Sequence, residues 1–124
     1  MIIQQKLYHV NMANSAMRTT VKVKGILMKA VLDIRANVSI VTLPVVKKLR
    51  LTMGMPDGSK IIAVDQIKKN VIGIIRDASL SIQDARVLIN LLVIEASEDN
   101  LLLETDWMDR YQVDLSFHKR ELRF

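Results

Sequence analysis

One carboxylate stands where the surrounding residues predict a buried corner. Asp33 follows an apolar run at residues 26–32 and precedes a second apolar run at residues 38–42. Both runs are rich in β-branched residues, which favours two short, largely buried strands. A buried carboxylate is costly unless it is hydrogen-bonded, paired or used in chemistry. Asp33 is therefore either an acid or base in a reaction, or a turn residue that bonds nearby backbone amides.

A second segment that could contribute to a site lies near the C-terminus. In residues 100–108, a leucine run ending at Leu103 is followed by Glu104, Thr105, Asp106 and Trp107. Thr105 is a suitable N-cap, so we expect one or two helical turns over residues 106–110 with Trp107 packed inward. Asp106 is then a residue of the helix start rather than a second catalytic acid.

Together these two segments resemble the retropepsins, the aspartic proteases of retroviruses and retrotransposons. Residues 32–40 keep the Asp and the Ala of the family pattern, hydrophobic-hydrophobic-Asp-Thr/Ser-Gly-Ala, at Asp33 and Ala36. Residues 100–108 resemble the family segment Ile/Leu-Leu-Gly-x-Asp-Trp-Leu/Met, and residues 111–115 and 121–124 look like its closing strands. The order and spacing agree over nearly the whole chain.

The resemblance implies one retropepsin-like domain over residues 1–124, dominated by β-strands, with one or two short helices. It also implies an aspartic endopeptidase that acts on polypeptides and needs no cofactor. That chemistry requires two carboxylates that share one proton. Because a chain of this length offers one suitable residue, Asp33, catalysis would require a homodimer in which each subunit supplies its own.

Three residues depart from the family pattern around the active-site motif. Ile34 stands where the family has Thr or Ser, so the hydroxyl that bonds the partner subunit is missing. Arg35 replaces a Gly with a permanently cationic side chain, and Glu104 replaces a Gly in the second motif. We therefore predict an impaired, protease-like domain. An active endopeptidase and a non-catalytic dimerisation or peptide-binding module remain as alternatives.

The segment at residues 53–64 predicts a hairpin. Asp57 and Gly58, followed by Ser59, form a strong turn signal between apolar flanks. By resemblance this hairpin is the flap that closes over a substrate, whereas the residues alone are equally consistent with an ordinary surface hairpin.

Other patterns predict the remaining elements. Residues 1–18 are poorly patterned and suggest a loose strand and a loop, and residues 43–51, with Pro44 near the start, suggest a short amphipathic helix. Gly25 makes a turn between strands, and Gly73 permits a bend or a close approach of the backbone. Besides those named above, we expect strands at residues 20–24, 67–75, 78–82 and 87–94.

Composition limits the class of protein. The chain has 124 residues, half of them hydrophobic, and no cysteine, which excludes disulfides and thiolate metal sites. No apolar run is long enough to span a bilayer and no signal peptide is evident, so we expect an intracellular protein, cytoplasmic or within a virus-like particle.

The charge pattern and the histidines suggest no further ligand. The net charge is +5, but the basic residues are scattered and lack interleaved aromatics, which favours a solvated surface over a nucleic-acid site. His9 and His118 lack the spacing of metal ligands, so we expect no metal.

Overall fold

The computed structural model describes residues 7–9, 11–13, 16–33, 38–55, 71–116 and 118–124. Strands dominate these residues, and two short helices accompany them: α1 (Leu43–Lys48) and α2 (Thr105–Arg110). The strands are β1 (Leu7–His9), β2 (Asn11–Ala13), β3 (Ala16–Val23), β4 (Ile26–Leu32), β5 (Ile40–Thr42), β6 (Val71–Ile82), β7 (Ala85–Ile94), β8 (Leu101–Leu103), β9 (Asp114–Ser116) and β10 (Glu121–Arg123).

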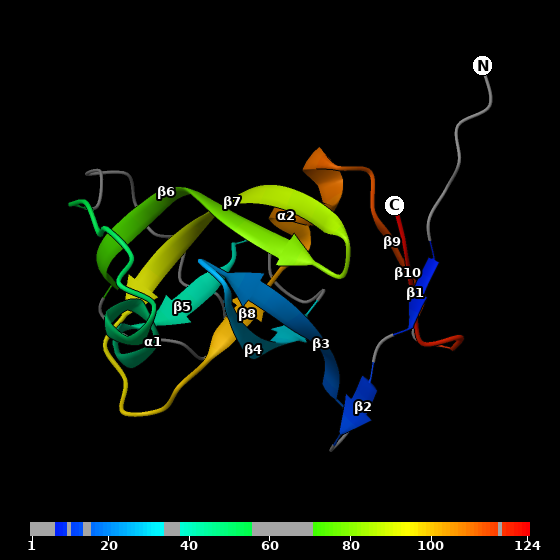
Figure 1. Cartoon of the computed structure of the whole chain (residues 1–124), viewed down its shortest axis with the longest axis horizontal. Coiled ribbons are helices and arrows are strands. Elements are labelled where there is room, and N and C mark those ends of the chain that lie inside the picture. Colours follow the sequence, from blue (N-terminus) through cyan, green and yellow to red (C-terminus); the bar gives the residue numbers. More distant parts are fainter. Residues whose placement is uncertain (1–6, 10, 14–15, 34–37, 56–70, 117) are drawn as a thin grey trace.

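The larger sheet closes on itself. Its strands follow the order β2-β3-β4-β8-β5-β7-β6, and an additional pairing joins β3 to β6. This seam pairs Val21 with Ile82 and Lys22 with Ser81, so strands β3 to β8 form a ring that surrounds the core. Closure of a sheet leaves few unpaired edges for another chain to join. Figure 1 shows β9, β10 and β1 gathered at one end of the molecule, beside this ring.

Alternation along the long strands decides which side chains enter the ring. In β3, Met17, Thr19, Val21 and Val23 are buried, whereas the residues between them are more exposed. The same alternation occurs in β6 and β7, as expected for strands with one face on a core. Trp107 of α2 belongs to this core, and so does Val45 of α1. Within the described ranges, neither helix has the length and hydrophobicity that a membrane crossing requires.

The structure confirms most of the predicted elements and corrects others. Strand β4 spans the predicted residues, and Gly25 makes the predicted turn, with φ values of 50° at Lys24 and 81° at Gly25. The prediction that this strand is largely buried was wrong, because only Ala30 and Leu32 of β4 are buried. The loop expected within residues 1–18 after a first strand was wrong at residues 11–13, because Asn11–Ala13 forms β2 on β3. The strands predicted at residues 67–75 and 78–82 form one strand, β6, over the described residues. The polar residues Arg76 and Asp77, which separate the two predicted strands, lie at a register shift between Ile75 and Ala78.

A further correction concerns the start of α2. Thr105 is the first residue of the helix, and Glu104 occupies the N-cap with an extended backbone and no side-chain cap hydrogen bond. The predicted packing of Trp107 is confirmed, because its side chain is 1% exposed.

Gly73 allows the close approach that the sequence suggested. A Cβ atom at this position would overlap the side chain of Met53 and lie 3.0 Å from the carbonyl oxygen of Gly54. The adjacent bridge between Gly54 and Ile74, with N···O distances of 2.8 and 3.1 Å, holds this segment on β6.

We predict that Gly73→Ala destabilises the chain by about 1–3 kcal/mol, because Met53 and the backbone must move to admit a methyl group. Gly54→Ala is a matched control, since a Cβ there meets its nearest atoms at 3.7 Å, an ordinary contact. Urea unfolding of both variants measures the difference. Equal stabilities would contradict the close approach at Gly73.

Candidate functional site

Asp33 lies at the end of β4, where β8 fixes its backbone. The two strands are parallel, with Leu32 opposite Leu103, and the Asp33 N–H donates to the Leu103 carbonyl at 2.9 Å. Asp33 itself is only partly buried. The candidate acid therefore follows the buried end of β4, at Leu32, and keeps access to solvent, as a reactive carboxyl requires.

Asp106 connects the start of β5 to the start of α2. Its Oδ2 accepts from the Ser39 N–H at 3.0 Å, and its Oδ1 accepts from the Ser39 hydroxyl at 2.7 Å. The Trp107 N–H donates to the same Oδ1 at 2.9 Å. Charge-assisted hydrogen bonds of this kind are short and strong. A carboxylate with three such donors is a structural tie, which agrees with the prediction that Asp106 belongs to the helix start.

Glu104 is buried beside the same corner. Its N–H donates to the Ser39 hydroxyl oxygen at 3.0 Å, and the residue is 2% exposed. Because Leu32 and Leu103 are paired, Asp33 and Glu104 each come directly after paired residues of adjacent strands. The segment that contains Glu104 therefore lies beside the segment that contains Asp33. Glu104, which stands where the family has Gly, is a buried carboxyl residue.

Trp107 and Met108 anchor α2 in the core. Both are buried, and the ring of Trp107 lies 6.0 Å from that of Phe124, inclined at 45°. This contact joins the second motif to the C-terminal strand region. Leu103, the last strand residue before the motif, is completely buried.

Several predicted site residues lie outside the described residues. They are Ile34, Arg35 and Ala36 of the first motif, and Asp57, Gly58 and Ser59 of the predicted flap. The structure therefore brings together Asp33, Leu103, Glu104, Asp106 and Trp107 among the predicted positions.

Two buried polar residues that the sequence did not single out lie at the two ends of β5, Ser39 beside the corner and Thr42 at the opposite end. Ser39 is completely buried, and its carbonyl accepts from the Leu92 N–H at 3.0 Å. Thr42 exchanges hydrogen bonds with Asn100: its N–H donates to the Asn100 carbonyl at 3.0 Å, and its hydroxyl oxygen accepts from the Asn100 N–H at 2.9 Å. The sequence does contain a sign of these contacts: a hydroxyl residue within an apolar strand needs a hydrogen-bond partner when it is buried.

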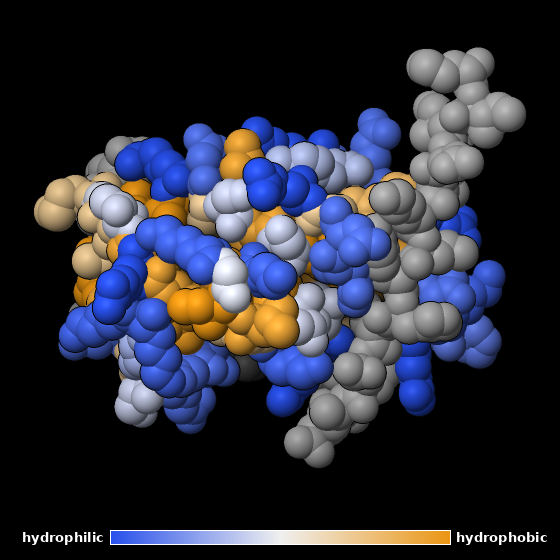
Figure 2. Space-filling model, in the orientation of Figure 1, coloured by the Kyte–Doolittle hydropathy of each residue, from blue (hydrophilic) through white to orange (hydrophobic). Residues whose placement is uncertain are grey.

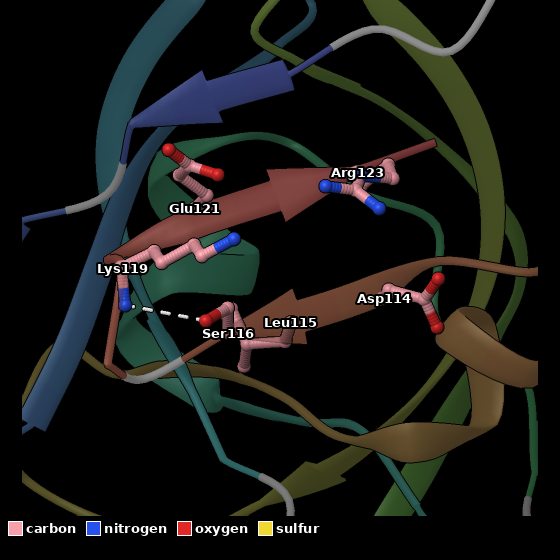
Figure 3. A pocket seen from close by; sticks show the side chains of 6 residues that line it. All are labelled: Asp114, Leu115, Ser116, Lys119, Glu121 and Arg123. Atoms are coloured by element: carbon pink, nitrogen blue, oxygen red, sulfur yellow. Dashed lines mark hydrogen bonds between the residues drawn. The ribbon is translucent and has the colours of Figure 1, made fainter.

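A separate hollow lies on the hairpin of β9 and β10. It measures about 290 Å³ and is lined by Asp114, Leu115, Ser116, Lys119, Glu121 and Arg123. Figure 3 shows these side chains on the two strands and, for Lys119, on the turn between them; the Lys119 N–H donates to the Ser116 hydroxyl at 3.2 Å. No predicted site residue lines this hollow. Among the described residues, no three histidine or carboxylate side chains gather as a metal ligand set.

We predict that Asp106→Ala lowers the free energy of unfolding by about 2–4 kcal/mol, because three donors lose a charged acceptor. The matched control is Asp109→Ala, which removes an exposed carboxylate from the same helix and should change stability by about 0.5 kcal/mol or less. Thermal and urea unfolding provide the comparison. Similar losses in the two variants would show that the tie to Ser39 contributes little.

Comparisons with known proteins agree with this geometry. The family model described as retroviral aspartyl protease matches residues 2–124. No curated protein matches the sequence significantly.

Among solved structures, the retroviral protease-like domain of Ddi1 from Leishmania major superposes with a TM-score of 0.66 at 19% identity, covering 83% of this chain and 82% of that one. A retropepsin-like aspartic protease from Rickettsia conorii superposes with a TM-score of 0.67 at 15% identity, covering 98% of this chain and 92% of that one. The EIAV protease, solved with the inhibitor HBY-793, superposes with a TM-score of 0.61 at 15% identity, covering 84% of this chain and 95% of that one. The fold is thus retropepsin-like, and the chain belongs to the retroviral aspartyl protease family.

Proposed function

We propose that this chain is a retroelement-derived, aspartic-endopeptidase-like domain that works as a homodimer, with Asp33 of each subunit facing the other across a two-fold axis. In such a pair, one ionised carboxylate takes a proton from a water molecule while the protonated partner donates to the scissile carbonyl. Family membership and the placement of Asp33 directly after the buried Leu32, with its N–H bonded to Leu103, support this arrangement. The substrate is a polypeptide bound between the dyad and a flap.

We further propose that catalysis is impaired. The observation that carries this proposal is Glu104, a 2% exposed side chain beside the corner that ends in Asp33. A carboxyl in this position adds bulk, and in its ionised form it adds a like charge that opposes ionisation of a neighbouring acid. The retropepsin pattern, with Gly here, introduces neither.

The first motif adds two further departures. Without a hydroxyl, Ile34 leaves groups of the partner subunit without their hydrogen bond, at about 1–3 kcal/mol for each group that remains buried. Arg35 is always cationic, and if its side chain reaches toward either Asp33 it favours the doubly ionised dyad, which cannot share a proton. Ile34 thus affects the dimer contact, Arg35 the protonation of the dyad, and Glu104 both the protonation and the packing around the acid.

We predict that restoring the family residues restores cleavage. The triple variant Ile34→Thr, Arg35→Gly, Glu104→Gly should cleave unfolded casein at mildly acid pH at least about tenfold faster than the unmodified chain, and pepstatin should inhibit it. The control carries the same triple change with Asp33→Asn and should be inactive. Pepstatin-sensitive cleavage by the unmodified chain at the rate of the triple variant would overturn impairment and favour an active endopeptidase.

We also predict that the unmodified chain is a dimer in sedimentation equilibrium, and that Asp33→Asn remains one. A neutral side chain removes repulsion between two facing carboxylates, so the dimer should be equally stable or more stable after the change. A strictly monomeric protein would contradict the proposed homodimer. A stable dimer that binds casein peptides while the triple variant still fails to cleave them would instead support a non-catalytic binding module.

A further inference from the structure

Closure of the ring brings distant basic residues onto one outer face. Lys22 of β3 lies opposite Leu27 of β4 on one side and opposite Ser81 of β6 on the other. Ser81 in turn lies opposite Arg86 of β7. These four side chains form one row across four adjacent strands, on the side opposite the buried Val21, Ile82 and Val87.

Two more cations flank this row. Arg18 and Lys22 share the outward face of β3, and Lys29 shares that of β4 with Leu27. The Lys29 ammonium donates to the Thr20 hydroxyl at 2.9 Å, which holds the cation on the face. Neighbouring strands are about 5 Å apart, and same-face residues along a strand are about 7 Å apart. Arg18, Lys22, Lys29 and Arg86 are hereafter called the cationic face. Lys22, Lys29 and Arg86 are exposed, whereas Arg18, at one end of the face, is half-buried and its Nε is inaccessible to solvent.

Strands β3, β4 and β7 contain no Asp or Glu, although Asp33 and Glu95 directly follow β4 and β7. Two exposed carboxylates, Asp77 and Asp84, belong to the β6–β7 hairpin. Asp77 is in the bulge of β6, 3.9 Å from Arg110, and Asp84 is in the turn before β7. In Figure 2, hydrophilic residues cover much of the surface over β3 and the β6–β7 hairpin, around a patch of apolar surface.

We propose that the cationic face binds the phosphate backbone of a single-stranded nucleic acid. Two arginines and two lysines supply charge-assisted donors, and the hydroxyls of Thr20, Ser79 and Ser81 lie among them, as is common for phosphate contacts. Leu27, 65% exposed, stands in the row beside Lys22 and offers an apolar contact to an unpaired base. Because the charged contacts are to phosphates rather than to base edges, binding is independent of base sequence and depends on salt.

Fluorescence anisotropy of labelled oligouridylate with the full chain tests this proposal. Binding should weaken steeply between about 50 mM and 200 mM salt, because each neutralised phosphate releases condensed counterions. The triple variant Lys22→Gln, Lys29→Gln, Arg86→Gln should weaken binding at low salt at least about tenfold. All three positions are exposed, so the variant should keep its circular dichroism spectrum and melting temperature.

The matched control is Lys47→Gln, Lys119→Gln, Arg120→Gln, which removes the same charge from exposed positions elsewhere. It should retain affinity within about threefold, since binding depends on placement as well as net charge. Absence of binding at low salt, or an equal loss in the control, would overturn the proposal. Tighter binding to polyglutamate or to phosphatidylserine vesicles than to oligouridylate would also overturn it, in favour of an acidic protein or a membrane surface. If the triple variant misfolds, the single changes Lys22→Gln and Arg86→Gln should each weaken binding about threefold.

Discussion

The carboxylate of Asp106 holds the two motifs of this domain together. It joins Ser39, before β5, to Trp107, in the first turn of α2, through three hydrogen bonds. The chain between β4 and β5 carries Asp33 at its start, so its far end must be fixed if the acid is to be positioned. A charged, partly buried acceptor suits this role because its donors would otherwise be left unsatisfied. The apolar packing of Trp107 then holds the helix to the core.

The same tie explains why the position of Glu104 matters. Its N–H also bonds to Ser39, so the backbone at this position cannot move away without breaking the network. A large side chain here must therefore be accommodated by its surroundings. In a protein interior, which is closely packed, such a change displaces neighbouring atoms rather than filling empty space. The chain thus keeps the framework that positions an acid while changing the space around that acid.

The sequence predicted those parts of the fold that depend on local pattern. Strand β4, the Gly25 turn, α1 and the burial of Trp107 follow from alternation, turn chemistry and helical spacing. The register of the ring is set by contacts between distant residues, which the local pattern does not reveal. The sequence therefore predicted two strands separated by Arg76 and Asp77, whereas these residues form a bulge within the single strand β6.

The candidate site divides in the same way. Asp33 was found because a carboxylate between apolar strands is unusual, and Glu104 because it interrupts a family motif. Ser39 was missed because a single hydroxyl carries little information until its partner, Asp106, is known. The basic residues of the cationic face are far apart in sequence, and only the pairing of β3 with β6 makes them neighbours.

The pairing of β1 with β10 has a topological consequence. Leu7 lies opposite Arg123 in an antiparallel ladder, so the two strands run in opposite directions and the chain enters and leaves the folded domain at one place. Paired residues of neighbouring strands are about 5 Å apart, a gap that a very short connector spans. A circularly permuted chain, with these positions joined and new termini in an exposed turn, would keep every strand pairing of the ring.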